Sequence, residues 1–228
     1  MRRILIVGTG SGVGKGLLER LGRQEDLETI AVSRSRPVEP VSQFIPYDVL
    51  SESNPPPLDG SLNGLVYCPG SILLKPFGSL GLNDFRADME VNFFGAVKLI
   101  RHYLPALKGS GNASVVLFSS VAAGNGMAYH SSIAAAKAAV EGLTRSLAAE
   151  LAPGVRVNAI APSIVGTQLA SKLINPEMKV KVAADRHPMK RIGTVSDIVS
   201  ATCYLLSEDS SWMTGQVLHC DGGLSAIR

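Results

Sequence analysis

A cluster of glycines directly follows a short apolar run near the N-terminus of this chain. The run Ile4–Val7 has the length and character of a buried parallel strand. The segment 8–14 reads GTGSGVG, and helical spacing follows from Val13 to Leu21. Glycine lets a ligand approach the backbone closely, and the free amides at the start of a helix attract phosphate. This pattern predicts a dinucleotide-binding turn.

The spacing of the glycines separates the known nucleotide-binding motifs. A G-x-G-x-x-G motif that starts at Gly8 needs a glycine where Val13 stands. A P-loop that ends at Gly14 needs a glycine at Thr9 and a serine or threonine at Gly16. The pattern that fits is G-x-x-x-G-x-G. The predicted phosphate-binding residues are therefore Gly8, Ser11, Gly12, Val13 and Gly14.

Strand-like and helix-like segments alternate along the rest of the chain. Further strands are expected at Thr29–Val32, Phe44–Ile45, Leu65–Cys68, Ser114–Phe118, Val155–Ile160 and Gln216–Cys220, and further helices at Asn83–Leu107, Ser132–Leu151 and Thr194–Leu206. This alternation predicts an α/β fold, a doubly wound Rossmann sheet of about seven parallel strands with helices on both faces. We expect one domain over residues 1–228, with the aperiodic segment 163–190 as a substrate lid and the proline-rich segment 51–61 as a surface loop.

Composition narrows the function classes. Hydrophobic residues make up 46% of the chain, and the net charge of +3 is too weak and too scattered to predict nucleic-acid binding. No apolar run is long enough to cross a membrane, and the apolar run at the N-terminus is too short for a signal peptide. The spacing of Cys68, Cys203 and Cys220 matches no metal site. These features predict a cytoplasmic protein with reduced thiols.

The end of the second strand bears on the choice of dinucleotide. An acidic residue at this point binds the ribose 2′-hydroxyl of NAD, whereas an arginine accommodates the 2′-phosphate of NADP. Arg34 follows the strand, and no acidic residue lies between Ile30 and Val38. The sequence therefore favours NADP(H) over NAD(H).

Several further segments, together with the glycine turn, resemble the short-chain dehydrogenase/reductase family over nearly the whole chain. The segments VNFFG (91–95), SSV (119–121), AKAAVEGL (136–143) and RVNAIAP (156–162) are similar to its signatures. The resemblance implies that Asn92, Ser120 and Lys137 are catalytic. It also implies that Asp48, Val49, Cys68, Pro69, Gly70, Lys137, Pro162, Val165 and Thr167 contact the cofactor.

The resemblance also implies an activity and an assembly. Members of the family transfer a hydride between a nicotinamide cofactor and a carbonyl or alcohol of a small-molecule substrate. We therefore expect an NADP(H)-dependent oxidoreductase. The same resemblance implies a homodimer or homotetramer built on the helices expected at Asn83–Leu107 and Ser132–Leu151.

Two departures from the family pattern affect the chemistry. The Asn-Asn-Ala-Gly that follows the fourth strand in the family reads YCPG at positions 67–70 here, which keeps only Gly70. More seriously, the family's proton-donating tyrosine, four residues before the lysine, is replaced by Ile133. Thirteen residues after Ser120, where family spacing also places that tyrosine, stands the same Ile133. An isoleucine cannot donate a proton.

Two nearby side chains could supply the missing acid. Tyr129 and His130 lie eight and seven residues before Lys137, in a glycine- and serine-rich stretch that favours a loop. We hypothesise that one of them donates the proton, because a loop can direct a side chain inward. The alternative is a catalytically silent NADP-binding sensor or scaffold, which Ile133 supports. The identity of the substrate does not follow from the sequence.

Overall fold

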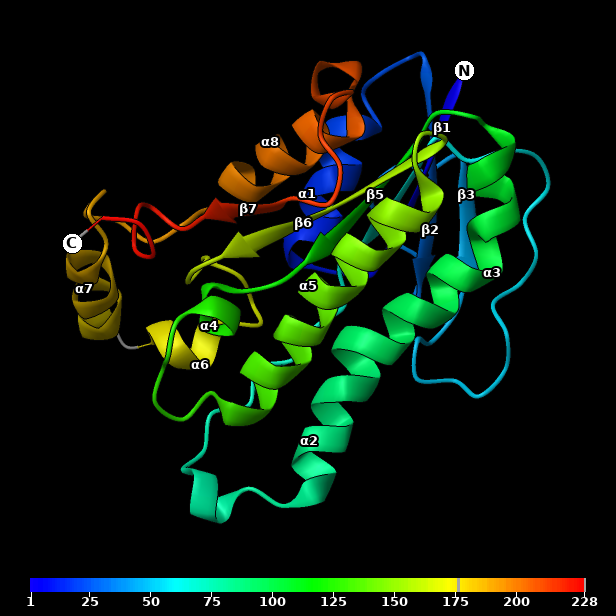
Figure 1. Ribbon diagram of the computed structural model, residues 1–228. Coiled ribbons are helices and arrows are strands. Elements are labelled where there is room, and N and C mark those ends of the chain that lie inside the picture. Colours follow the sequence, from blue (N-terminus) through cyan, green and yellow to red (C-terminus); the bar gives the residue numbers. More distant parts are fainter. Residues whose placement is uncertain (176, 228) are drawn as a thin grey trace.

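The structure, a computed structural model, describes residues 1–175 and 177–227 and is built on one parallel sheet (Figure 1). Its seven strands are β1 (Arg2–Val7), β2 (Leu27–Ser33), β3 (Gln43–Pro46), β4 (Gly64–Tyr67), β5 (Ala113–Phe118), β6 (Val155–Pro162) and β7 (Val217–Cys220). They lie in the order β3-β2-β1-β4-β5-β6-β7, and every pairing is parallel. The predicted doubly wound Rossmann fold is confirmed.

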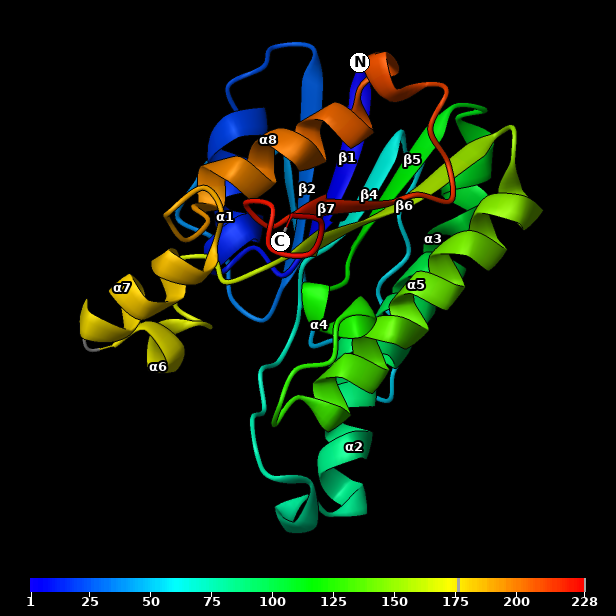
Figure 2. The ribbon, with the colours of Figure 1, turned by 60° about the vertical axis from the view of Figure 1, so that its left-hand side comes forward.

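Helices cover both faces of this sheet, as Figure 2 shows. The helices are α1 (Gly12–Leu21), α2 (Leu82–Met89), α3 (Gly95–Gly109), α4 (Val121–Gly124), α5 (Ser131–Leu151), α6 (Ser171–Ile174), α7 (Glu177–Arg186) and α8 (Val195–Leu206). Within the part of the chain described, no helix is both long and apolar enough to cross a bilayer. The segment 51–61 contains no helix or strand, as expected from its prolines.

Residues 4–7 of β1 are all apolar because both faces of the strand are buried there. Leu5 and Val7 pack into the core beneath α3 and α5, whereas Ile4 and Ile6 pack into the core beneath α1 and α8. Successive side chains of a strand point to opposite faces, so a strand between two helical layers needs apolar residues at every position. This requirement explains why Ile4–Val7 does not alternate.

The long helix expected over Asn83–Leu107 is interrupted. Its two parts, α2 and α3, are joined by a π-helical turn over Glu90–Phe94, in which the amide of Gly95 donates to the carbonyl of Glu90. The wider turn leaves the carbonyl of Val91 free to accept the Tyr67 hydroxyl at 2.6 Å. Gly95 is required there, because a Cβ would lie 2.1 Å from the Tyr67 Oη. Such turns occur frequently at functional sites.

Helix α8 begins after an N-cap residue, Thr194. The Thr194 hydroxyl accepts a hydrogen bond from the Asp197 amide at 3.2 Å and donates to the Asp197 carboxylate at 2.8 Å. The same carboxylate accepts from the Thr194 amide at 2.7 Å, which completes a capping box. The hydrogen bonds that the Asp197 carboxylate accepts, first from Arg191 and then from Thr194, hold the pKa of Asp197 well below its usual range.

We expect Thr194→Ala to lower the free energy of unfolding by about 1 kcal/mol, the usual value of an N-cap hydroxyl. Chemical denaturation of the wild type and the variant measures this difference. Ser196→Ala is the matched control, since Ser196 is exposed on the same first turn and forms no hydrogen bond through its side chain among the described residues. Equal losses in both variants would contradict the capping role.

Candidate active site

The glycine turn brings α1 against the end of β1. Gly8 has φ +83° and Gly12 has φ +55°, values that side chains rarely allow. At Gly14 a Cβ would lie 2.2 Å from the carbonyl oxygen of Gly8, which is closer than atoms can approach. Gly10, by contrast, faces open space. Absent side chains therefore fix where the first turn of α1 lies.

The N-terminus of α1 lacks the caps that α8 has. Ser11 is the N-cap residue, but its side chain makes no capping hydrogen bond, and no acidic residue lies in the first turn. Helix α8 instead satisfies its first amides with Thr194 and Asp197. Uncapped amides and the positive end of the helix dipole are the groups that bind a phosphate anion. The start of α1 therefore fits a pyrophosphate.

Other predicted cofactor residues form the walls beside this turn. Gly8 lies against Pro69, whose ring is 2.9 Å from where a Cβ of Gly8 would be. A Cβ on Gly12 would likewise lie 3.5 Å from the Thr167 side chain. Because β1 and β4 are neighbours, Gly8 and Pro69 meet at the topological switch point, where open α/β sheets bind ligands.

The residues predicted to contact the adenosine half lie at the neighbouring strand ends. Arg34 follows β2 and is exposed. The Thr9 hydroxyl lies 2.9 Å from that of Ser33, which ties the glycine turn to the end of β2. Asp48 follows β3 and is exposed, and its carboxylate accepts the Leu50 amide at 3.0 Å. Val49 packs against the core beneath α3.

Asn92, Gly70 and Lys137 come together in a buried cluster. A Cβ on Gly70 would lie 3.2 Å from the Asn92 Oδ1 and 3.6 Å from the Lys137 Nζ. The Lys137 side chain is buried and donates to the Phe118 carbonyl at 2.9 Å. Burial lowers the pKa of Lys137 to about 8, although Asp88 and Cys68 oppose the shift. A lysine on an alanine-rich helix is usually solvated, and this one is not.

Ser120 follows β5 and begins α4. Its Oγ accepts a hydrogen bond from the Ala122 amide at 3.2 Å, so it caps this short helix. That bond leaves the hydroxyl hydrogen of Ser120 free to donate. The preceding Ser119 is buried and donates to the Glu141 carboxylate at 2.7 Å. Of the two serines, Ser120 is thus the one with a free hydrogen.

The position of the missing tyrosine is apolar and closed. Ile133 is buried in the first turn of α5. Tyr129 and His130 lie in the loop before that helix, as expected, with the Tyr129 side chain 59% exposed and its φ at +69°. The ring Nδ1 of His130 lies 2.7 Å from the Ala128 carbonyl. No described contact joins Tyr129 or His130 to Lys137.

Two polar residues of the cluster, Asp88 and Ser71, are not among the predicted site residues. The Ser71 hydroxyl donates to the Asp88 Oδ1 at 2.5 Å and accepts from the Asn92 amide at 2.8 Å. Asp88 lies four residues before Asn92, a spacing that places both side chains on one helix face. That spacing was the one available signal, and charged residues on helices are ordinarily assigned to solvent.

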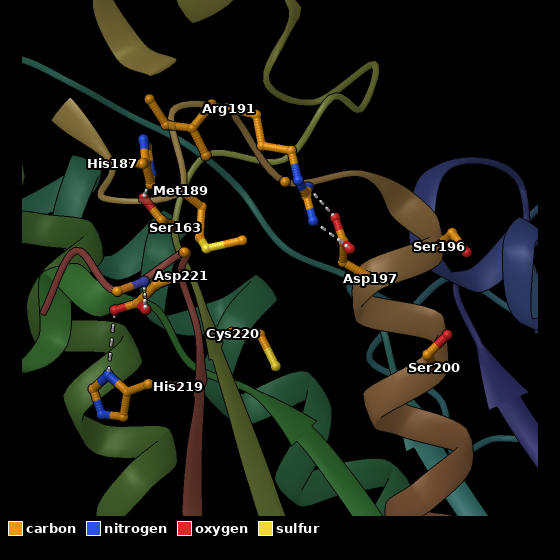
Figure 3. Close-up of a pocket in the computed structure, with 14 residues that line it drawn as sticks. Ser163, His187, Met189, Arg191, Ser196, Asp197, Ser200, His219, Cys220 and Asp221 are labelled. Atoms are coloured by element: carbon orange, nitrogen blue, oxygen red, sulfur yellow. Dashed lines mark hydrogen bonds and ion pairs between the residues drawn. The ribbon is translucent and has the colours of Figure 1, made fainter. Parts of the chain in front are cut away.

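A pocket of about 400 Å³ lies apart from the glycine turn, between the two ends of segment 163–190, α8 and β7 (Figure 3). The His187 ring is buried, with Nε2 2.8 Å from the Ser163 Oγ and Nδ1 2.7 Å from the Ala183 carbonyl. Across the pocket, Arg191 pairs with Asp197 through two contacts of 2.6 and 2.9 Å. The bond between His187 and Ser163 joins the two ends of segment 163–190 to each other, and the Arg191–Asp197 pair ties the residue just after the segment to α8.

Comparison with known proteins identifies the family. A family model described as enoyl-(acyl carrier protein) reductase matches residues 55–225. A tropinone reductase homolog of Datura stramonium is 32% identical, covering 96% of this chain and 90% of that protein. The 3-oxoacyl-(acyl-carrier-protein) reductase of Buchnera aphidicola is 28% identical, covering 96% of each. The chain belongs to the short-chain dehydrogenase/reductase family of NAD(P)-dependent oxidoreductases.

Solved structures agree with this assignment. The aldohexose dehydrogenase of Thermoplasma acidophilum, in ligand-free form, has a TM-score of 0.90 and 29% identity, covering 100% of this chain and 95% of that one. A putative NAD(P)-dependent gluconate 5-dehydrogenase of Beutenbergia cavernae, with bound NADP at low occupancy, has a TM-score of 0.87 and 28% identity, covering 99% and 97%. The fold of an oxidoreductase that holds NADP is therefore shared over almost the whole chain.

We expect Gly14→Ala to abolish dinucleotide binding, because its Cβ would force the start of α1 away from Gly8. Fluorescence titration with NADPH measures binding, and thermal unfolding measures the accompanying loss of stability. Gly10→Ala is the control for stability, since its Cβ would meet no atom within 4 Å. A Gly14→Ala variant with wild-type affinity would show that the turn does not hold the nucleotide.

Proposed function

We propose that this chain is an NADP(H)-dependent oxidoreductase that transfers a hydride to or from a carbonyl or alcohol, with a proton donor other than residue 133. The observation that carries the proposal is the uncapped, glycine-lined start of α1 at the switch point, with Pro69 against Gly8 and the buried Lys137 next to Gly70. A phosphate site and a positive charge thus lie against neighbouring residues of one segment. The family supplies the class of reaction.

The cofactor contacts follow from the order of the strand ends. The glycine turn and Ser11 would hold the pyrophosphate, Asp48 and Val49 the adenine, and Arg34 a 2′-phosphate. The nicotinamide half would lie between the segment 68–70 and the residues Pro162, Val165 and Thr167, within reach of Lys137. NADP(H) supplies the hydride when bound. Arg34 and the lack of acidic residues between Ile30 and Val38 support a preference for NADP(H) over NAD(H).

The remaining residues would act on the substrate. Ser120, whose hydroxyl hydrogen is free, would hold the carbonyl oxygen, and Asn92 and Lys137 would support proton transfer. Tyr129 or His130 would donate the proton, and the left-handed backbone of Tyr129 supports this choice because such strain often accompanies function. We further propose one domain over 1–228, with 163–190 as the substrate lid and α2, α3 and α5 as the surface of a homo-oligomer.

We expect Arg34→Ala to weaken NADPH binding by about tenfold to hundredfold, the range of a hydrogen bond between charged groups, and to leave NADH binding unchanged. Parallel fluorescence titrations with both coenzymes measure this. Arg36→Ala is the comparison, because the Arg36 guanidinium already lies 5.8 Å from the centre of the Phe44 ring. Equal losses for NADPH and NADH in Arg34→Ala would contradict the 2′-phosphate role.

We expect either Tyr129→Phe or His130→Ala to lower turnover by about 10²–10⁴-fold, the usual contribution of a general acid. NADPH consumption against a panel of carbonyl substrates measures turnover. Unchanged rates in both single variants would exclude both residues as the donor. Tight NADPH binding by the wild type with no consumption across the panel would instead support the silent sensor or scaffold that Ile133 suggests.

A further inference from the structure

A buried carboxylate lies beside the proposed active site. Asp88, near the end of α2, is 2% exposed. Its Oδ1 accepts the Ser71 hydroxyl, whereas its Oδ2 is buried without a hydrogen-bond partner among the described residues. Burying a charge costs a large free energy unless another charge compensates it. The position of Asp88 therefore calls for a nearby cation.

Lys137 is the cation of the same cluster. Its ammonium group gives one hydrogen to the Phe118 carbonyl and has two more to donate. Asn92 connects the two residues. Its amide nitrogen donates to the Ser71 hydroxyl and to the backbone carbonyl of Asp88, both at 2.8 Å. Its Oδ1 faces Gly70, which lies beside Lys137. Asp88 and Lys137 thus flank Asn92 in one buried network.

We propose that Asp88 is a positioning residue that keeps Lys137 in its charged form, with Ser71 holding the Asp88 carboxylate in place and Asn92 holding Ser71. The effect on nucleotide binding rests on the proposed function, whereas the effect on the charge of Lys137 does not. Because residue 133 is an isoleucine, the Lys137 ammonium is a buried group of this site that can carry a proton. Whether it does so depends on the charges beside it.

The other titratable groups around Lys137 do not supply this counter-charge. Burial raises the pKa of Cys68, so at neutral pH it is a neutral thiol. Glu141, on the same helix as Lys137, accepts the Ser119 hydroxyl at 2.7 Å and pairs with Arg145 at 3.8 Å. Burial alone would lower the pKa of Lys137 further, and the charge of Asp88 opposes that shift. Asp88 is thus the group that preserves the ammonium.

Removing the charge of Asp88 has a definite sign. In Asp88→Asn the largest opposition to the desolvation of Lys137 is removed, so the pKa of Lys137 falls below about 8 and its charge is lost at lower pH. Well below both pKa values, Lys137 is charged in the wild type and the variant alike. A difference between them therefore emerges only as the pH rises through the pKa of the variant.

Carbon-13 NMR of protein labelled at lysine Cε measures this charge directly. The Lys137 signal is assigned by its absence in Lys137→Arg. We expect its midpoint near pH 8 in the wild type and lower by about one pH unit in Asp88→Asn, as for the loss of a nearby opposite charge. Asp84→Asn is the matched control, because Asp84 lies on the same helix as Asp88 but pairs with Lys75 at 3.1 Å. We expect the Lys137 midpoint to stay unchanged in this variant.

An unchanged midpoint in Asp88→Asn overturns the proposal. Should that variant fail to fold, Asp88→Leu removes the same charge, and apolar replacements of buried charges are often tolerated. NADPH titration provides a second readout. We expect Asp88→Asn to match the wild type near pH 6 and to bind about fivefold more weakly near pH 8, the factor that a one-unit shift gives. Equal weakening at both pH values would indicate a merely structural role.

The two proposals fail in different ways. If the wild type binds no NADPH while the Lys137 midpoint still falls in Asp88→Asn, the proposed function is wrong and the role of Asp88 stands. If NADPH binds and the midpoint stays in place, the function stands and the role of Asp88 is wrong.

Discussion

The contact between the start of α1 and the carbonyl of Gly8 is the one on which the rest of the site depends. Gly14 makes it possible, since any Cβ there would lie 2.2 Å from that oxygen. The contact holds the uncapped amides of α1 at the end of β1, where Pro69 closes on Gly8 from β4. A side chain at position 14 would displace the helix and with it the amides that lie at the end of β1.

The π-helical turn relates two features that look independent in the sequence. Tyr67 replaces a smaller polar residue of the family pattern, and burial raises the pKa of its hydroxyl, so it needs an acceptor. The turn provides that acceptor by freeing the Val91 carbonyl, and Gly95 leaves space for the ring. The same turn carries Asn92 into the cluster with Gly70 and Lys137. The Tyr67 hydroxyl is thus occupied at Val91 and cannot replace the missing acid.

The parallel sheet, its approximate number of strands and the glycine turn could be predicted because each rests on a local pattern: apolar runs, helical spacing and glycines at a turn. The order of the strands was not predicted, because it depends on pairings between segments that are distant in the sequence. Other features were missing from the prediction because no local pattern marks them. The four-residue helix α4 is too short to show a period, and one extra residue in a π turn barely disturbs the apolar spacing of Asn83–Leu107. The burial of Asp88 depends on Ser71, which lies 17 residues away in the sequence.

Ile133 supports a loss of catalytic activity, whereas the buried charges of Asp88 and Lys137 support a retained function. A buried carboxylate whose Oδ2 has no hydrogen-bond partner in the part of the chain described costs free energy, and so does a desolvated lysine. Apolar side chains of similar size would often serve stability equally well or better. A chain that only needed to fold, or only needed amides to hold a diphosphate, would gain nothing from this pair. Its presence next to Asn92 is most simply explained if a charged Lys137 still acts on a bound ligand.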